Sequence, residues 1–232
     1  MASPNKGYWP TGTNANSTWL SSYITDSILD PRGEFNIVRK DRQNCRGGDV
    51  CAIVRKCLSI ISLCILDMYQ ELEVVGFDLI NITPSVRVFA VYQPPHYDQV
   101  DVDLVNTLVS FLVRYATGAN KQHVIVGDLN LPRINWNAST CHSDMVHRPV
   151  LDFAVNFGFS QLVDFNTRGD NLIDVILIDD SMLIAKVGAL RPIWHSDHLV
   201  VEFTVYSVNL QVNSTSYDPS ADDVKTVSMV SC

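Results

Sequence analysis

The sequence predicts an α/β protein in which two mixed β-sheets pack on each other, with helices outside them. Three observations support this fold class. Hydrophobic periodicity predicts many strands and few helices. The segment at 123–128, "HVIVGD", is almost wholly apolar, which is typical of a strand covered on both faces. Helices do not alternate regularly with strands, which argues against a doubly wound sheet.

The first half of the chain is predicted to contain two pairs of strands. "EFNIVRK" at 34–40 and "DVCAIVRK" at 49–56 predict a hairpin whose turn contains the two glycines of "RQNCRGGD". "LEVVGFDLI" at 72–80 and "VRVFAVY" at 86–92 predict a second pair, which turns at "NITPS". The "PP" that comes next ends regular structure, because proline has no backbone N–H to donate.

The second half is predicted to contain two helices and several strands. From Asp101 to about Thr117 apolar residues recur at helical spacing, and a second helix near 147–157 ends at Gly158, a helix C-cap. Further strands are expected at 123–128, 171–178, 186–190 and 199–206.

The length of 232 residues is enough for one large domain with a core of its own. We expect this domain at 17–206, between a flexible or degenerate N-terminus at 1–16 and a disordered tail or linker at 207–232, rich in Ser, Asn and Asp. The net charge of −8 argues against a surface that coats nucleic acid generally. It does not argue against an enzyme that contacts DNA locally.

The compartment is predicted to be nuclear or cytoplasmic. The N-terminus lacks the basic start and apolar run of a secretory signal. The longest apolar stretch, "CLSIISLCILDMY", is too short and too interrupted to span a membrane. The six cysteines show no metal-binding spacing, so we expect free thiols in a protein that is not secreted.

The buried strand at 123–128 ends on an acid, and an amide stands two residues later. Side chains at i and i+2 of a strand point the same way, so Asp128 and Asn130 are expected to face one cleft together, where they could hold and polarise a water molecule. The alternative is an Asx turn that simply closes the strand, and for such a short motif taken alone this alternative is favoured.

Three further positions could carry chemistry. "WHSDHLV" places Asp197 beside His198, where an acid could hold a cation and a histidine could contact a phosphoryl oxygen; the alternative is a polar loop. Asp174 lies within an apolar strand, where a buried acid needs a partner, and we expect it to form a hydrogen bond with His198. The alternative is an acid on an edge strand that faces water. Tyr92 ends a strand and could reach a phosphate, or be a core tyrosine.

Taken together, these motifs resemble the endonuclease/exonuclease/phosphatase superfamily, which has the fold of pancreatic deoxyribonuclease. Within it, "GDLNLPRINW", "NTRGDNLIDVIL" and "VRKDRQNCRGGDVCAIVRK" resemble the endonuclease domain of non-LTR (LINE-like) retrotransposons. The resemblance covers about 17–206 and implies a four-layer sandwich. It also implies hydrolysis of DNA phosphodiesters with Mg²⁺, or Mn²⁺ as an alternative, in a polyprotein with a reverse transcriptase.

The resemblance also implies roles for the site residues. Asp128 would orient or deprotonate the attacking water, with Asn130 helping to hold it. His198, backed by Asp174, would contact the scissile phosphate. Tyr92 would bind the phosphate or support the leaving group, and the remaining acid, Asp197, would lie on the metal side.

The chain departs from the family pattern on the metal side. "STWL" places Ser17 where the family has a metal-binding glutamate. No segment before it resembles the family's first strand, and the absence of that strand would expose the edge of a neighbouring strand. We therefore expect a weakened endonuclease or, as the alternative, a catalytically dead remnant or binding module. A phosphatase of the same fold is a weaker third interpretation.

Overall fold

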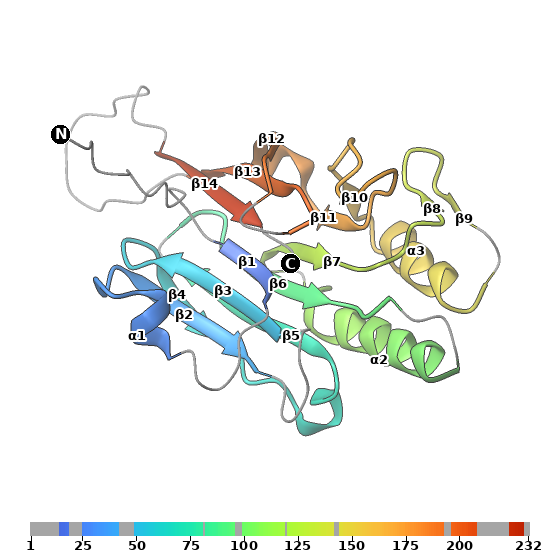
Figure 1. Cartoon of the computed structure of the whole chain (residues 1–232), viewed down its shortest axis with the longest axis horizontal. Coiled ribbons are helices and arrows are strands. Elements are labelled where there is room, and N and C mark those ends of the chain that lie inside the picture. Colours follow the sequence, from blue (N-terminus) through green and yellow to red (C-terminus); the bar gives the residue numbers. More distant parts are fainter. Residues whose placement is uncertain are drawn as a thin grey trace.

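The computed structural model describes nine segments of the chain (Figure 1). They are residues 14–18, 25–41, 49–80, 82–95, 99–118, 120–141, 144–192, 196–207 and 223–229. Most of the strands in these segments fall into two six-stranded sheets.

The two sheets are both mixed. The first has the order β12 (Ile184–Leu190), β13 (Val200–Ser207), β14 (Asp223–Met229), β1 (Asn14–Thr18), β3 (Asp49–Arg55) and β2 (Phe35–Lys40). The second has the order β10 (Ser160–Gln161), β11 (Asp174–Ile178), β7 (Gln122–Asp128), β6 (Val86–Tyr92), β5 (Glu73–Ile80) and β4 (Ser59–Ser62). A small hairpin of β8 (Ile134–Asn135) and β9 (Thr140–Cys141) stands apart.

One hydrophobic core lies between the two sheets. Alternate residues of the strands point into it, because successive side chains of a strand face opposite sides. Val50 and Phe203 come from the first sheet, and Phe77, Val126 and Ile176 come from the second. All five are at most 2% exposed, and burial of such side chains contributes about 1.5–3 kcal/mol each.

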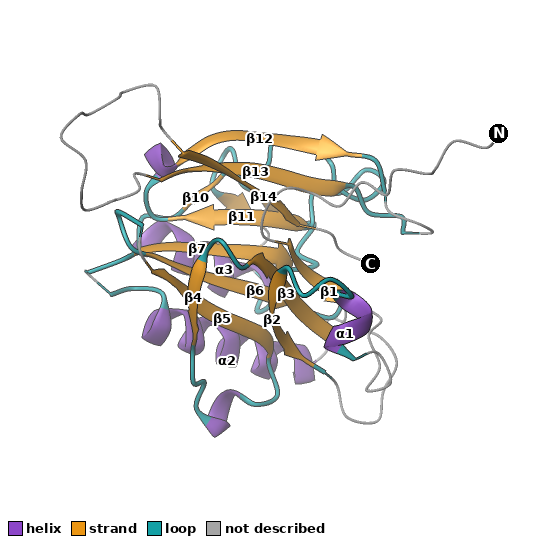
Figure 2. Ribbon diagram, turned by 90° about the vertical axis from the view of Figure 1, so that its left-hand side faces the viewer, coloured by secondary structure: helices purple, strands orange, loops and turns teal. Residues whose placement is uncertain are grey.

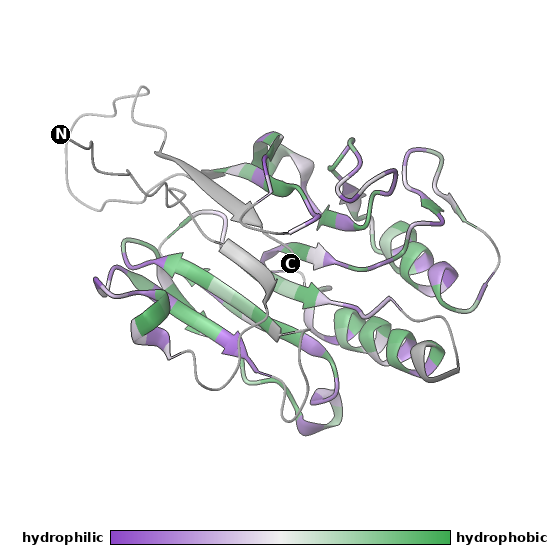
Figure 3. Cartoon of the chain, viewed as in Figure 1, coloured by the Kyte–Doolittle hydropathy of each residue, from purple (hydrophilic) through white to green (hydrophobic). Residues whose placement is uncertain are grey.

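A second core lies between the second sheet and two helices, α2 (Gln99–Tyr115) and α3 (His147–Asn156). Leu108, Phe111 and Leu112 fall on one face of α2 and are fully buried, whereas its described exposed residues are polar except Val113; Figure 3 shows hydrophobic and hydrophilic residues alternating along this helix. This buried face packs on Phe89 and Ile125, on the side of the sheet away from the first sheet (Figure 2). The fully buried strand at 123–128 is thus covered on both faces, as its apolar sequence predicts.

The outer side of the first sheet carries one helical turn, α1 (Asp26–Leu29). Val38 of β2 packs against the inter-sheet core, so the next residue, Arg39, points outward, where it forms an ion pair with Asp26 at 3.3 Å. Two 3₁₀ turns, η1 (Asp67–Tyr69) and η2 (Ser181–Leu183), complete the described helices. The order of layers is therefore helix, sheet, sheet and helix.

Most predicted elements are present. The predicted helix at 101–117 is α2, and Gly158 lies just after α3 in the left-handed conformation, with φ +73°, as expected of a C-cap. The hairpin at 34–56 is present as the antiparallel pair β2 and β3, although most of its turn lies outside the described residues. The short strands β4 and β8 to β10 were not predicted, because segments of two to four residues carry little periodicity.

The expectation of an open sheet edge was wrong. β1 pairs with β3 on one side and in parallel with β14 on the other, where Asn14 lies opposite Ser228. β14 also pairs antiparallel with β13 along its whole length. Residues 223–229 therefore form a strand within the segment expected to be a disordered tail, and β1 begins within the segment expected to be flexible. The polar composition of 207–232 gave no sign of this strand, because the hydrogen bonds that hold a strand in a sheet come from the backbone and do not require apolar side chains.

Two other expectations concern cysteines and membranes. Cys51, Cys57, Cys64 and Cys141 are free thiols, as predicted, while positions 45 and 232 lie outside the described residues. Among the described helices, none has the length and apolar character needed to cross a membrane.

Candidate active site

Three neighbouring strands of the second sheet place polar side chains at one end of the sandwich. Asp128, the last residue of β7, lies opposite Tyr92 in the parallel ladder with β6 and opposite Asp174 in the antiparallel ladder with β11. Val126 and Ile176 lie two positions away and point into the inter-sheet core. Asp128 and Asp174 therefore point toward the first sheet, at the end of that core.

A glycine fixes the position of Asp128. Gly127 has φ +149°, and a Cβ atom there would lie 1.7 Å from the carbonyl oxygen of Val91 on β6. Only a residue without a side chain allows this close approach of the two strands. The next carbonyl, that of Asp128, accepts a 2.9 Å hydrogen bond from the N–H of Gln93, which extends the pairing past the end of β6.

A buried histidine joins the two carboxylates. Nδ1 of His198 lies 2.9 Å from Oδ2 of Asp174, so the predicted hydrogen bond is present. Nε2 of the same ring lies 3.9 Å from Oδ2 of Asp128. That gap is too long for a direct hydrogen bond, yet short enough for one oxygen atom to contact both groups. All three residues are at most 3% exposed.

Thr167 holds this cluster together, although sequence reasoning assigned it no role. Its hydroxyl accepts hydrogen bonds from the N–H groups of Ile173 and Asp174, and its carbonyl accepts one from Leu199, next to His198. It is 1% exposed, so these bonds are shielded from water. The only signal in the sequence was its place within the family-like stretch "NTRGDNLIDVIL".

Asn130 reaches the site by a turn, so the strand argument for its direction was wrong. β7 ends at Asp128, and Asn130 has φ +47°, a left-handed conformation that asparagine tolerates. Its N–H donates to Oδ1 of Asp128 at 2.9 Å, which is the Asx turn named as the alternative. Its Nδ2 also donates to the carbonyl of Gln93 at 2.8 Å, so the buried amide is held in place.

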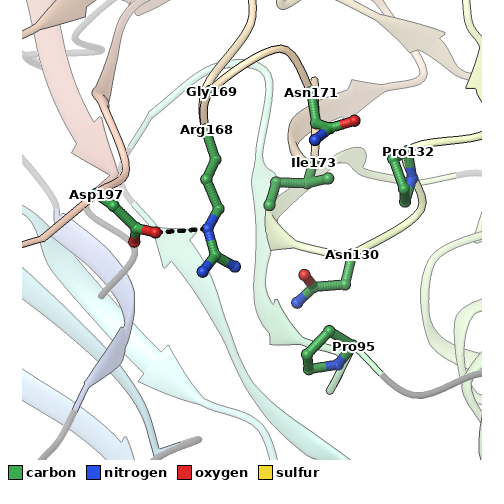
Figure 4. A pocket seen from close by; sticks show the side chains of 8 residues that line it. All are labelled: Pro95, Asn130, Pro132, Arg168, Gly169, Asn171, Ile173 and Asp197. Carbon is green, nitrogen blue, oxygen red and sulfur yellow. Dashed lines mark hydrogen bonds and ion pairs between the residues drawn. The ribbon is translucent and has the colours of Figure 1, made fainter.

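Asp197 lies at the exposed rim of the site. Its Oδ2 accepts a 2.7 Å hydrogen bond from Nε of Arg168, and its Oδ1 lies 3.8 Å from Nε2 of His198 (Figure 4). Its side chain is 64% exposed, in contrast to the buried cluster. Arg168 was also missed by sequence reasoning, because an isolated arginine in a turn gives no periodic signal.

The electrostatics of the cluster suit a base beside a cationic histidine. Burial, and then the charge of Asp174, raise the pKa of Asp128 to about 7. Burial opposes the charged form of His198, but the hydrogen bond and charge of Asp174, with the charge of Asp128, raise its pKa above the ordinary value. Partial burial also opposes ionisation of Asp197, but the bond from Arg168 lowers its pKa.

The buried cluster has donors that fit a divalent cation. Asp128, Asp174 and His198 each offer one ligand atom, and these atoms lie within 4.8 Å of one another. Oδ1 of Asp174 is buried and has no hydrogen-bond partner within the described part of the chain. A buried carboxylate oxygen without a partner is costly, so a cation or water there would be stabilising. Asp197, the residue predicted to bind metal, is outside this group of three.

Two other predicted positions lie nearby. Tyr92 is half-buried at the end of β6 and packs against the inter-sheet core, next to Asp128 in register. Ser17 pairs with Val50 across β1 and β3, and β1 lies against β6 and β7. The position expected to carry the glutamate is thus on a strand adjacent to the strands that end in the cluster.

Comparisons with solved structures agree with this fold. The chain is similar to the endonuclease domain of TRAS1, a telomere-specific non-LTR retrotransposon, with a TM-score of 0.58, 13% identity, and coverage of 87% of this chain and 100% of that one. It is also similar to the 3′ phosphatase NExo from Neisseria bound to a product DNA hairpin, with a TM-score of 0.61, 13% identity, and coverage of 82% and 97%. The AP endonuclease LMAP from Leishmania major gives a TM-score of 0.57 and 10% identity, with coverage of 81% and 76%.

Comparisons by sequence give one assignment. No curated protein matches the chain. The family described as endonuclease-reverse transcriptase matches residues 86–202, which include Tyr92, Asp128, Asp174 and His198. At identities of 10–13% the structural likeness establishes the DNase I-like fold alone. Because the family match covers just over half of the 232 residues, the chain belongs to the endonuclease-reverse transcriptase family.

Proposed function

We propose that this chain is a DNA endonuclease that hydrolyses phosphodiester bonds with the help of a divalent cation, and that Ser17 weakens its activity. The observation that carries the proposal is the buried arrangement of His198 between Asp174, at 2.9 Å, and Asp128, at 3.9 Å. A structural histidine needs one partner, whereas this ring also turns its second nitrogen toward a carboxylate whose pKa is about 7. Such a pair of perturbed groups is typical of active sites.

The roles of the residues depend on charge and reach. Asp128, with a pKa of about 7, can accept the proton of an attacking water near neutral pH. His198, whose raised pKa favours the cation, can donate from Nε2 to a phosphoryl oxygen while Asp174 fixes the ring. Asn130 can donate to the same water or phosphate, since it faces the adjoining pocket. Tyr92 can support the leaving group.

A divalent cation would neutralise the negative charge that develops on the phosphoryl and leaving oxygens. The residues that would hold it are Asp128 and Asp174, whose carboxylate oxygens lie close together, with Asp197 at the rim as the third acid. Mg²⁺ prefers oxygen ligands, which favours the carboxylates over His198. Mn²⁺ tolerates nitrogen as well and binds such sites more tightly.

Ser17 is the expected weak point. A serine hydroxyl is a poor substitute for a carboxylate on Mg²⁺. The strand that carries it lies against β6 and β7, so a carboxylate at this position would lie in the neighbourhood of the site. Loss of one such charged interaction typically lowers a rate by about 10²–10³.

The test is nicking of supercoiled plasmid DNA by the purified chain, with and without Mg²⁺ or Mn²⁺. We expect slow nicking that Mn²⁺ enhances, that Ser17→Glu raises, and that Asp128→Ala abolishes in the Ser17→Glu background. Asp152→Ala serves as the matched control, because Asp152 pairs with Arg148 on the outer helix α3. Nicking that survives Asp128→Ala would refute the proposed base.

The second candidate is a fold that binds DNA without cutting it, and Ser17 is the observation that favours it. Under this alternative, DNA binding persists while neither Mn²⁺ nor Ser17→Glu produces nicking. We further propose that the domain acts in a retrotransposon polyprotein with a reverse transcriptase. This is supported by the family's description and by the likeness to the TRAS1 endonuclease domain. Mass spectrometry of the endogenous protein would test it, since a polyprotein gives peptides of both domains in one chain.

A further inference from the structure

A pocket of about 500 Å³ adjoins the catalytic cluster (Figure 4). It is of a size that holds a small ligand or one unit of a larger one. Two of its residues, Asn130 and Asp197, also border the buried cluster, whereas Asp128, Asp174 and His198 do not line it. The lining residues are Pro95, Asn130, Pro132, Arg168, Gly169, Asn171, Ile173 and Asp197.

Arg168 is the only cation among the described residues that line this pocket. Its Nε donates to Asp197, and Figure 4 shows the two terminal nitrogens turned away from that carboxylate, toward the space between Asp197 and Asn130. Within the described part of the chain, the hydrogen bond and ion pair of this guanidinium both run through Nε, which leaves the terminal nitrogens to other acceptors. The side chain is 43% exposed, so a ligand can reach it.

The backbone holds Arg168 in register with the catalytic histidine. Arg168 forms a bridge with His198, and its N–H and carbonyl pair with Asn171 at 3.1 and 2.9 Å. Gly169, with φ +54°, allows the tight turn between them. The guanidinium is thus anchored both through this turn and through Asp197, which lowers the entropy lost when it binds a ligand.

The carboxylates around His198 give the Arg168 guanidinium a role in binding DNA. Asp128, Asp174 and Asp197 all lie within 4 Å of the His198 ring nitrogens in a chain of net charge −8, and these carboxylates disfavour a polyanion. A guanidinium whose terminal nitrogens have no hydrogen-bond acceptor among the described residues can bind two phosphate oxygens at once. Its position beside His198 places such a contact next to the bond that the proposed function would cut.

We propose that Arg168 is the phosphate clamp of a DNA subsite: its terminal nitrogens bind the phosphodiester adjacent to the scissile one, while Asp197 orients it through Nε. This subsite rests on the proposed function, because the scissile phosphate is taken to lie at His198. Asn130 and Asn171 supply amide groups around the bound unit, and Pro95, Pro132 and Ile173 supply an apolar wall for its sugar.

The experiment measures binding of a fluorescein-labelled 20-base-pair DNA duplex by anisotropy, in EDTA, over a series of salt concentrations. The variants are Arg168→Ala and Arg168→Lys. The matched control is Arg148→Ala, because Arg148 also donates from Nε to a carboxylate at 2.7 Å and is similarly exposed, but lies on α3 outside the pocket. Thermal unfolding of each variant monitors the fold.

We expect Arg168→Ala to weaken binding about tenfold or more and to reduce the slope of log K against log salt by about one. Arg168→Lys should keep the slope and lose part of the affinity, because lysine keeps the charge and lacks the fork. Arg148→Ala should change the affinity less than twofold. Equal losses in Arg168→Ala and Arg148→Ala, or no binding by the unmodified chain, would overturn the subsite.

The same variants separate the subsite from the proposed function. If binding depends on Arg168 but no condition yields nicking, the subsite stands and the endonuclease proposal fails. If the chain nicks DNA and Arg168→Ala neither weakens binding nor slows nicking at subsaturating DNA, the subsite is refuted and the endonuclease proposal stands.

Discussion

The substitution Asp128→Asn should make the protein more stable at pH 8, because the ionised carboxylate is held where burial and Asp174 oppose its charge. The pKa of Asp128 is about 7 in the folded chain, against an ordinary value of 3.8. Since the folded-state value is the higher one, the stabilising contribution of the protonated acid is fully present below 3.8. It is lost as the pH rises through 7.

The magnitude depends on the size of this shift. Each pKa unit corresponds to about 1.4 kcal/mol, so ionised Asp128 costs the folded state at most about 4 kcal/mol at pH 8. Between pH 5 and pH 7, Asp128 is protonated in the folded chain and ionised in the unfolded chain, and above pH 7 it is ionised in both. The gain from Asp128→Asn should therefore be about 3 kcal/mol larger at pH 8 than at pH 5.

The assay is urea unfolding of both proteins at pH 5 and pH 8, observed by circular dichroism. Asp78→Asn provides a control of opposite sign, because Arg87 and Lys121 outweigh the effect of burial and lower the pKa of Asp78. This control should lose stability by about the same amount at pH 5 and pH 8, because Asp78 is ionised in both the folded and the unfolded chain above its ordinary pKa of 3.8. If the gain from Asp128→Asn is the same at both pH values, the carboxylate is not held against its charge in the folded chain.

Three further outcomes are expected. Gly127→Ala should prevent native folding, seen as loss of the cooperative thermal transition, because its Cβ would lie 1.7 Å from a carbonyl oxygen. The control Gly118→Ala should be tolerated, because no atom lies within 4 Å of the added Cβ. Equal behaviour of the two variants would contradict the close approach of β6 and β7. Deleting residues 208–232 removes β14 and should lower the melting temperature and raise light scattering, because β1 and β13 each lose a partner; an unchanged melting curve would contradict that pairing. Nicking by Ser17→Glu should rise with pH as Asp128 loses its proton, with a midpoint below 7 because a bound cation lowers the pKa of a carboxylate that it contacts; a rate that is flat between pH 5 and pH 8 would exclude Asp128 as the base.

The sandwich could be predicted from sequence because its core strands have strong local patterns. The apolar run at 123–128 predicted a strand covered on both faces, and this is β7. The spacing of Leu104, Leu108, Phe111 and Leu112 predicted α2 to within two residues. β14 could not be predicted in this way, because its stability depends on β1 and β13 rather than on an apolar run of its own.

The site was predictable where a buried charge demanded a partner. Asp174 within an apolar strand implied a histidine, and His198 fulfils this at 2.9 Å. The direction of Asn130 was not predictable from strand alternation, because the chain leaves the strand at Asp128. Thr167 and Arg168 act through contacts between distant segments, which no local pattern encodes.

The pairing of β1 with β14 also has a consequence for the order of folding. The second sheet and its helices are built from residues 59–178, so most of this unit can assemble before the C-terminal strands are synthesised. Asn14, in contrast, meets Ser228 only after residue 228 has left the ribosome. Closing so long a loop makes this contact entropically expensive and late. During synthesis, β1 therefore exposes one row of unpaired backbone groups, and a chaperone or a neighbouring nascent chain could bind there.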